Sequence, residues 1–295
     1  MRTHLWVSVV AATLAVAITG CSSSDKSSKG SVKYLGLGDS IAYGQNDFVA
    51  YTQDARPNGD AFIGYPDLLG PEVFGGQYEN LGCPGATTSS FLSLDGVDNG
   101  CRDFQMNWLD TMHVQYTSTE QDETLKVLGM NDATAITLDI GANDLLVTLD
   151  GCSTMNPGNA NAALICAIQQ LPQAIDTGAA NLAAIFKGIR DSGFKGDLVY
   201  VNLYSTYLPT DTATTAISAW NSAMAPVVAN AGGQVADVFT AFANAASASG
   251  GDPCAAGLLI PNPDPTAMPA CDIHPTAMGA RLLADTVKAT PGFGP

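Results

Sequence analysis

Short apolar runs alternate along this chain with longer segments of helical periodicity, and this rhythm is the strongest constraint on its fold. Parallel strands need a long crossover between them, and a helix usually supplies it. The alternation therefore predicts an α/β fold in which helices cover both faces of a parallel sheet. We expect strands at residues 32–38, 77–82, 133–140, 198–203 and 234–239.

Helices and loops are expected between these strands. Segments with the apolar spacing of amphipathic helices are residues 162–190, 213–231 and 275–289. Pro172 is expected to kink or split the first of them, and Pro275 is expected near the first turn of the last. Segments rich in glycine, asparagine, proline and aspartate, which are expected to be loops, are residues 93–103, 150–161 and 249–272.

The N-terminus has the features of an export signal. Arg2 precedes an apolar run over residues 5–18, which is too short to span a bilayer comfortably. Small residues then lead to Cys21, as they do before a cleavage site. Residues 18–21, ITGC, resemble a bacterial lipobox, and this resemblance implies that Cys21 becomes the lipid-modified first residue of the mature protein. The alternative is an ordinary secretory signal with a chance cysteine.

Composition limits the organisation and the partners of the chain. A hydrophobic content of 46% with no linker after residue 31 indicates one large core. We expect a signal peptide at residues 1–20, a lipid-anchored, serine-rich tether at residues 21–31 and one domain at residues 32–295. The net charge of -16 argues against nucleic acid and against docking on anionic lipid by charge alone. We expect an exported monomer, held on the outer side of the cell membrane by its anchor or released from the cell.

Six cysteines remain when Cys21 is assigned to lipid, and they lie in local pairs separated by 18, 14 and 17 positions. An even number of cysteines in an exported chain indicates disulfide bonds, although six cysteines allow about 15 pairings. The spacing contains no C-x-x-C pair, so a zinc site is not expected. We predict the local pairs Cys83–Cys101, Cys152–Cys166 and Cys254–Cys271.

The residues that follow the expected strands are chemically distinctive. Reactive groups in an open α/β sheet gather at the carboxyl ends of the strands. Ser40 follows the first strand, in the stretch GLGDSIAYG, which matches neither the dinucleotide-binding glycine pattern nor a phosphate-binding loop. The other blocks are NLGCPGAT at residues 80–87 and GAND at residues 141–144, each after an expected strand, and CDIHPT at residues 271–276, near the last expected helix. A serine, a glycine loop, an amide and a histidine are the groups that acyl transfer requires.

In this order and over most of residues 33–290, the motifs GDS, N-x-G-x-x-G, GAND and D-I-H-P resemble the SGNH/GDSL hydrolase family. The resemblance implies a three-layer α/β/α flavodoxin-like fold with a parallel sheet of about five strands. It also implies an esterase or lipase that hydrolyses carboxylic esters through an acyl-enzyme, without a metal or cofactor. The G-x-S-x-G motif of the α/β-hydrolase fold is absent from the sequence.

The resemblance assigns a role to each block. It implies that Ser40 is the nucleophile and His274 the general base, because a serine hydroxyl needs a neighbouring base to react. It further implies an oxyanion hole, whose fixed donors stabilise the charge of the tetrahedral intermediate. These donors are the backbone N–H of Ser40, the backbone N–H of Gly85 and the side-chain amide of Asn143. Gly82 is a rival of Gly85 for this contact.

The third member of the triad departs from the family's familiar D-x-x-H arrangement, because Cys271 stands three positions before the histidine. Asp272, two positions before it, is our candidate, and a main-chain carbonyl of Cys271 or Asp272 is the alternative. His113 is the weaker candidate base, since no partner motif surrounds it. Asp39 is expected to cap the helix that follows it rather than to take part in the chemistry.

A solute-binding lipoprotein without catalysis is the alternative function, and it predicts two lobes of comparable size. Within the enzyme interpretation the substrate is a small-molecule or lipid ester, and the sequence does not choose between these. Aromatic residues that could line a substrate pocket, but at this density more often form core, are Tyr43, Phe48, Tyr51, Tyr65, Phe91 and Tyr207.

Overall fold

A computed structural model describes residues 31–45, 62–107, 112–208, 211–262, 264 and 270–294. The expected signal peptide and the lipidation candidate Cys21 lie outside these residues, as do Phe48 and Tyr51. None of the described helices combines the length and the apolar character that crossing a membrane requires.

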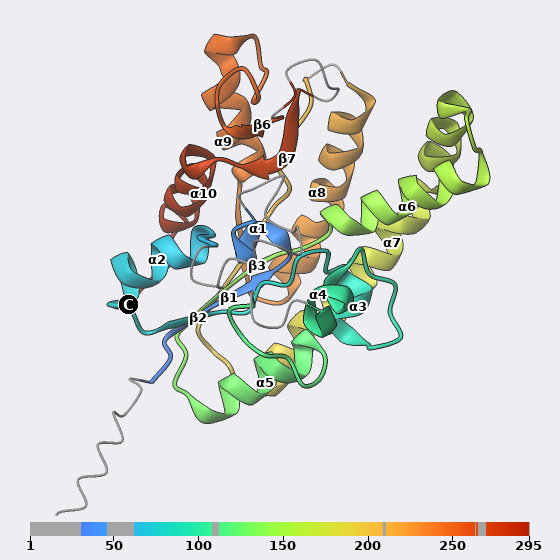
Figure 1. Ribbon diagram of the computed structural model, residues 1–295. Helices are drawn as coiled ribbons and strands as arrows, with labels where there is room; N and C mark the ends of the chain where they lie inside the picture. Colours follow the sequence, from blue (N-terminus) through green and yellow to red (C-terminus); the bar gives the residue numbers. More distant parts are fainter. Residues whose placement is uncertain are drawn as a thin grey trace, which may run out of the picture.

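Five parallel strands form the central sheet, in the order β2-β1-β3-β4-β5 (Figure 1). They are β1 (Tyr34–Gly38), β2 (Tyr78–Asn80), β3 (Ala135–Asp139), β4 (Asp197–Val201) and β5 (Gln234–Ala236). The strand order runs outward in opposite directions from β1 and β3, which is the doubly wound arrangement of flavodoxin-like folds. The predicted fold class is therefore confirmed. The described residues contain one large sheet and not the two lobes of a solute-binding protein.

Helices cover both faces of this sheet. In the described residues they are α1 (Ser40–Tyr43), α2 (Tyr65–Phe74), α3 (Thr88–Leu92), α4 (Cys101–Asn107), α5 (Glu120–Met130), α6 (Ala142–Met155), α7 (Ala160–Asp191), α8 (Thr212–Asn230), α9 (Val238–Ala246), the short 3-10 helix η2 (Ser247–Ser249) and α10 (Ala277–Lys288). Side chains of α5, α7 and α8 form one buried cluster with Leu35 and Ile136. Side chains of α2, α9 and α10 form a second cluster with Tyr34 and Ala135. Neighbouring strand residues point to opposite faces, so the two clusters are the two interfaces of a three-layer structure.

Two elements extend beyond the three layers. The first is a helical hairpin, made of α6 and the first part of α7, which projects from the body of the molecule (Figure 1). The disulfide Cys152–Cys166 joins its two helices. We call residues 142–171 the α6–α7 hairpin. The second is an antiparallel ribbon of β6 (Leu259–Pro261) and β7 (Cys271–Pro275), which lies beside α1.

Several expected boundaries were wrong, and side-chain caps explain two of them. The fifth strand ends at Ala236 because Asp237 caps α9, with its carboxylate accepting from the Thr240 N–H. Pro275 ends β7 instead of lying in the last helix, because Thr276 is the N-cap of α10. Helix caps of this kind can stop a strand that periodicity alone would continue.

The expected break at Pro172 is also wrong, because α7 continues through it. Pro172 is exposed, so the carbonyl that lacks a helical partner can bond to water. The expected loops at residues 93–103, 150–161 and 249–272 contain the start of α4, the end of α6 with the start of α7, and β6 with the start of β7. Disulfides at Cys101, Cys152 and Cys271 hold ordered structure in segments whose composition favours turns.

Gly178 offers a test of the packing between α7 and α8. A Cβ atom at this position would lie 2.2 Å from the ring of Trp220, which is fully buried. Gly178→Ala should therefore destabilise the protein by about 1–3 kcal/mol in urea unfolding, despite the helix propensity of alanine. Gly151→Ala in α6 is the control, because a Cβ there meets no atom within 4 Å. That variant should be neutral or slightly stabilising, and equal loss in both would contradict this account.

Candidate active site

Ser40 lies at the carboxyl end of β1, in the first turn of α1. The preceding Gly38 has a φ of 139°, and a Cβ atom there would lie 2.1 Å from the Asp139 carbonyl, so only glycine fits. Asp39 then caps α1, because its Oδ1 accepts from the Ile41 N–H at 3.0 Å. This confirms the expected capping role of Asp39. The tight turn brings Ser40 to the topological switch point between β1 and β3.

His274 reaches the same point from β7, 234 residues further along the chain. Its Nε2 lies 2.9 Å from Ser40 Oγ, and its Nδ1 lies 2.9 Å from Asp272 Oδ2. Of the acceptors that the sequence left open, the Asp272 carboxylate is the one in contact with the ring. Tyr204 supports the strand by donating to the Ile273 carbonyl at 2.7 Å.

The charge of Asp272 decides the direction of these hydrogen bonds. Partial burial raises the pKa of this carboxyl, but the hydrogen bond and charge of His274 outweigh burial and hold the pKa below its usual value. An ionised carboxylate only accepts, so His274 Nδ1 donates to Asp272. Nε2 is then free to accept the proton of the Ser40 hydroxyl. This is the tautomer that a general base beside a serine needs.

Two of the expected oxyanion donors are backbone N–H groups, those of Ser40 and Gly85. Within the described part of the chain, no group accepts a hydrogen bond from either of them. The N–H of the rival Gly82 already donates to Asn80 Oδ1 at 2.9 Å, so binding an oxyanion there would cost this hydrogen bond. Gly85 has a φ of 84°, and a Cβ atom there would lie 2.2 Å from the Asn99 carbonyl. This position therefore also requires glycine.

Asn143, the third expected donor, follows β3 and lines the same cavity as Ser40. Its Nδ2 donates to the Ala86 carbonyl at 3.0 Å and to Asp39 Oδ2 at 3.3 Å. Asn99 fixes the amide orientation by donating to Asn143 Oδ1 at 2.9 Å. The longer bond to Asp39 is the weaker of the two donated bonds, so an oxyanion would compete with it.

A pair of buried carboxyl groups lies beneath the serine. Asp39 and Asp139 hydrogen bond to each other through their side chains. Burial and the charge of Asp39 raise the pKa of Asp139 well above its usual value, so Asp139 holds the shared proton. Asp139 Oδ1 also accepts from the Tyr65 hydroxyl at 2.9 Å. Asp139 was not predicted from the sequence, although its place at the end of β3, two residues before the GAND block, was a usable signal.

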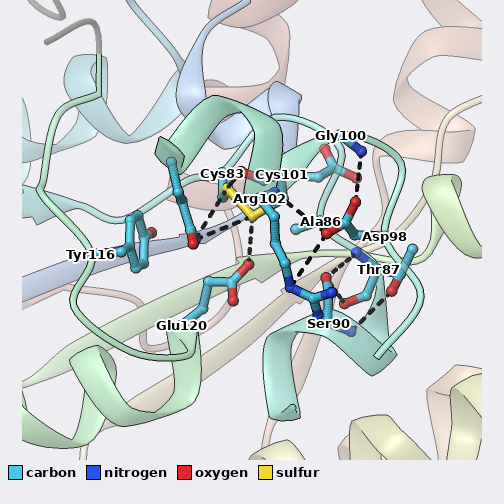
Figure 2. The surroundings of a disulfide bond; sticks show 12 residues. Cys83, Ala86, Thr87, Ser90, Asp98, Gly100, Cys101, Arg102, Tyr116 and Glu120 are labelled. Carbon is cyan, nitrogen blue, oxygen red and sulfur yellow. Dashed lines mark hydrogen bonds and ion pairs between the residues drawn. A yellow bond between two sulfur atoms is a disulfide. The ribbon is translucent and has the colours of Figure 1, made fainter. Parts of the chain in front are cut away.

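The disulfide Cys83–Cys101 closes the loop that carries Gly85. Figure 2 shows the carboxyl group of Glu120 directed at this disulfide, and Glu120 Oε1 lies 3.0 Å from Cys101 Sγ. A disulfide sulfur has no hydrogen to donate, so this contact is favourable only when the carboxyl is protonated. Burial accordingly raises the pKa of Glu120 to about 7. The two sulfurs are bonded to each other, so they do not act as thiolate ligands for a metal.

The glycine loop is also tied to α6. Asp144 accepts from both the backbone N–H and the hydroxyl of Thr88, at 3.0 and 2.6 Å. Asn181 of α7 donates to the same hydroxyl at 3.1 Å. These bonds, with the one from Asn143 to the Ala86 carbonyl, tie the glycine loop to the block that carries Asn143.

A cavity of about 310 Å³ opens beside Ser40 and Asn143. Ser40 and His274 are only 7% and 8% exposed, so a substrate reaches them through this cavity. A larger hollow of about 410 Å³, at the amino ends of β4 and β5, contains none of the motif residues.

His113 and most of the described candidate aromatic residues do not line the cavity beside Ser40. His113 Nε2 lies 2.9 Å from the Tyr43 carbonyl, and the structure does not bring this histidine to Ser40. Tyr43, Tyr65 and Phe91 are fully buried core residues, whereas Tyr207 lines the cavity. The three predicted disulfides are all present.

Known proteins share features of this sequence and of this fold. The family model described as "GDSL-like Lipase/Acylhydrolase family" matches residues 37–282. An extracellular lipase from Streptomyces rimosus is similar in structure, with a TM-score of 0.55 at 19% identity, covering 88% of this chain and 99% of that one. Phospholipase A1 from Streptomyces albidoflavus has a TM-score of 0.53 at 19% identity, with the same coverage. A mutant of an acetyl-xylooligosaccharide esterase from Geobacillus has a TM-score of 0.51 at 15% identity, covering 87% of this chain and 93% of that one. No curated protein matches the chain.

The raised pKa of Glu120 predicts a pH-dependent stability. Its protonated form stabilises the fold fully below the ordinary glutamate pKa, and this contribution is lost as the pH rises through about 7. The loss amounts to on the order of 3 kcal/mol. In Glu120→Gln the side chain at this position is neutral at every pH. The melting temperature of this variant should therefore fall less than that of the wild type between about pH 5 and about pH 8.5. Exposed Asp150→Asn is the control and should follow the wild type. Parallel curves for the wild type and Glu120→Gln would refute the assignment.

Proposed function

Because the chain belongs to the GDSL-like lipase/acylhydrolase family, we propose that it is a serine ester hydrolase that works through an acyl-enzyme on Ser40. His274 is the general base and Asp272 orients it. The observation that supports these roles most strongly is the pair of 2.9 Å contacts that links Ser40 Oγ, His274 and Asp272. Two of the similar structures are named as lipolytic enzymes and one as a carbohydrate esterase. The substrates that these names imply have only an ester bond in common.

The reaction proceeds in two halves. Ser40 Oγ attacks the ester carbonyl carbon while its proton passes to His274 Nε2. The tetrahedral intermediate collapses, the bond to the leaving oxygen breaks, and His274 returns the proton to the departing alcohol. Water then attacks the acyl-enzyme and gives one proton to His274, which passes it back to Ser40 as the acid leaves. One ester and one water thus become one acid and one alcohol.

The oxyanion of each intermediate is stabilised by three donors. The N–H groups of Ser40 and Gly85 have no partner within the described residues, and they cost no hydrogen bond when they bind the oxyanion. The Asn143 amide gives up its longer bond, to Asp39, in order to donate. The two backbone donors are fixed by the chain, so they need no reorganisation as the charge develops.

We further propose that the enzyme is exported, with residues 1–20 as its signal peptide and Cys21 as its lipid anchor. The lipobox-like ITGC sequence supports the anchor. The three disulfides support an oxidising compartment, where such bonds persist.

The catalytic assignment predicts how variants hydrolyse p-nitrophenyl acetate. Ser40→Ala and His274→Ala should each abolish measurable turnover. Asp272→Asn should lower kcat by up to roughly 10⁴-fold, because an amide donates to Nδ1 and favours the wrong tautomer. His113→Ala is the matched control and should keep wild-type activity. Wild-type turnover by a folded Ser40→Ala protein would exclude the proposal.

The oxyanion hole makes a separate prediction. Asn143→Ala should lower kcat by roughly 10²–10³-fold with little change in KM, because the lost donor acts in the transition state. Asn99→Ala removes only the contact that orients the Asn143 amide, so its loss should be clearly smaller. If Asn143→Ala kept kcat within about ten-fold of the wild type, this residue would not be an oxyanion donor.

A further inference from the structure

We propose that the cavity beside Ser40 binds the long acyl chain of the ester, and that the exposed apolar residues of the α6–α7 hairpin contact the neutral lipid aggregate that supplies it. This inference rests on the proposed function, because it takes Ser40 as the atom that attacks the substrate. It adds a substrate class and a surface for recognising it.

The cavity has the lining of an acyl-chain site. From Ser40 it extends between the α6–α7 hairpin and the start of α8. Aliphatic side chains make up most of both walls, and they include Leu145, Leu146, Leu149, Leu164, Ile168 and Ile217. Asp39, Asp139 and Asn143 lie together beside Ser40, whereas the other polar lining residues are Thr148, Asn202, Tyr204, Thr206, Tyr207, Thr212 and Thr215. A largely apolar site with charged and amide groups beside the nucleophile suits a molecule with a polar head and an apolar tail.

The length of the cavity exceeds what an acetyl group fills. Asn143 and Leu149 both line it and are separated by six positions of one helix. This separation corresponds to about 9 Å along the helix axis. An acetyl group would leave most of that apolar wall in contact with water. A longer acyl chain would bury it, and each buried methylene could raise kcat/KM by up to about four-fold.

The outer end of the cavity continues into an exposed apolar surface. Leu149, Leu164 and Ile168 line the cavity yet are 40%, 44% and 46% exposed. Ile165, next to Leu164 on α7, and Met155, at the end of α6, are 56% and 62% exposed. Isolated exposed apolar side chains are common, but a group of them at the mouth of an apolar cavity indicates an interaction surface.

The charge distribution selects a neutral lipid surface as the partner. No lysine, arginine, aspartate or glutamate occurs between Asp150 and Asp176, although the chain carries a net charge of -16. The hairpin thus offers apolar contact without cations that would attract anionic headgroups. An acidic protein is repelled by an anionic bilayer, whereas a zwitterionic or uncharged aggregate does not oppose it.

The hairpin is prepared for this contact. Cys152 and Cys166 join α6 to α7 beside the cavity, because the lining residues Leu164 and Ala167 flank Cys166 in the sequence. Their disulfide holds the two cavity walls contributed by the hairpin at a fixed spacing. Less ordering is then needed when a lipid surface binds, which favours binding.

The first test compares acyl chains of different length. Wild-type kcat/KM for p-nitrophenyl octanoate should exceed that for the acetate by at least about ten-fold, with both substrates monomeric. Ala216→Trp fills the cavity from α8 and should lower the octanoate-to-acetate ratio by about ten-fold or more. Ala219→Trp, exposed on the same helix and outside the cavity, is the control and should keep the ratio.

The outcomes of this test separate the two proposals. A flat dependence on chain length with normal acetate hydrolysis would overturn this inference and leave the serine hydrolase assignment intact. An equal loss on octanoate and acetate in folded Ala216→Trp would also overturn it. Loss of the hydrolase assignment itself would appear as turnover in Ser40→Ala.

The second test places a fluorescent reporter on the hairpin. In a full chain that carries Ser40→Ala to prevent hydrolysis, Ile165→Trp should add emission that shifts to the blue with phosphatidylcholine vesicles. Met130→Trp is the control, because Met130 is 66% exposed at the end of α5, away from the cavity. It should show no shift. In the active enzyme, Ile165→Ser should lower the rate at which an ester in vesicles is hydrolysed. This loss should be at least about five-fold greater than the loss on monomeric p-nitrophenyl acetate.

Three results would contradict the docking surface. One is a shift of equal size at both reporter positions, and another is no shift at Ile165→Trp. The third is a dimer in sedimentation velocity that Ile165→Ser dissociates without changing the rate on vesicles, because a second copy of the chain would then cover the hairpin.

Discussion

The hydrogen bond between Ser40 and His274 joins the first strand of the domain to a ribbon near its end, 234 residues later. The 2.9 Å contact depends on two segments that are held separately, the turn after β1 and the β6–β7 ribbon. Ser40 is held by the tight turn after β1, at the centre of the sheet. His274 is held by the β6–β7 ribbon, which the Cys254–Cys271 disulfide closes. The sheet order places both at the carboxyl edge, where an open α/β fold leaves space for a ligand.

A network of buried polar side chains connects the Ser40–His274 hydrogen bond to the oxyanion donor Asn143. Asp39 caps the helix of the serine, accepts from Asn143 and shares a proton with Asp139. A buried charge without partners is strongly destabilising, so the pair shares a proton and keeps a single negative charge, which hydrogen bonds from Ile41, Asn143 and Tyr65 compensate. The same residues therefore hold the nucleophile and one oxyanion donor in a single hydrogen-bonded network. The stability of the carboxyl edge of the sheet and the catalytic geometry thus depend on the same contacts.

Much of this arrangement could be predicted from the sequence, because its signals are local. Parallel strands could be predicted from the alternation of apolar runs and helical segments. Ser40 could be predicted from a short motif after the first strand, and His274 from a short motif before the last helix. The extent of α6 could not be predicted, because turn-forming residues after Gly151 suggested a loop while a disulfide kept the segment helical. The carboxyl pair was also missed, since the pairing of Asp139 with Asp39 exists only once β1 and β3 lie side by side. The cavity likewise arises from packing between helices that are distant in sequence.

Covalent labelling with an organophosphonate ester, located by peptide mass spectrometry, tests the central claim most directly. The reagent reports on a serine that a neighbouring base activates, whatever the natural substrate. The account predicts one adduct, on the peptide that contains Ser40, forming quickly in the wild type and very slowly in a folded His274→Ala protein. An adduct on another residue, or labelling of Ser40 at the same rate with and without the imidazole, would contradict it.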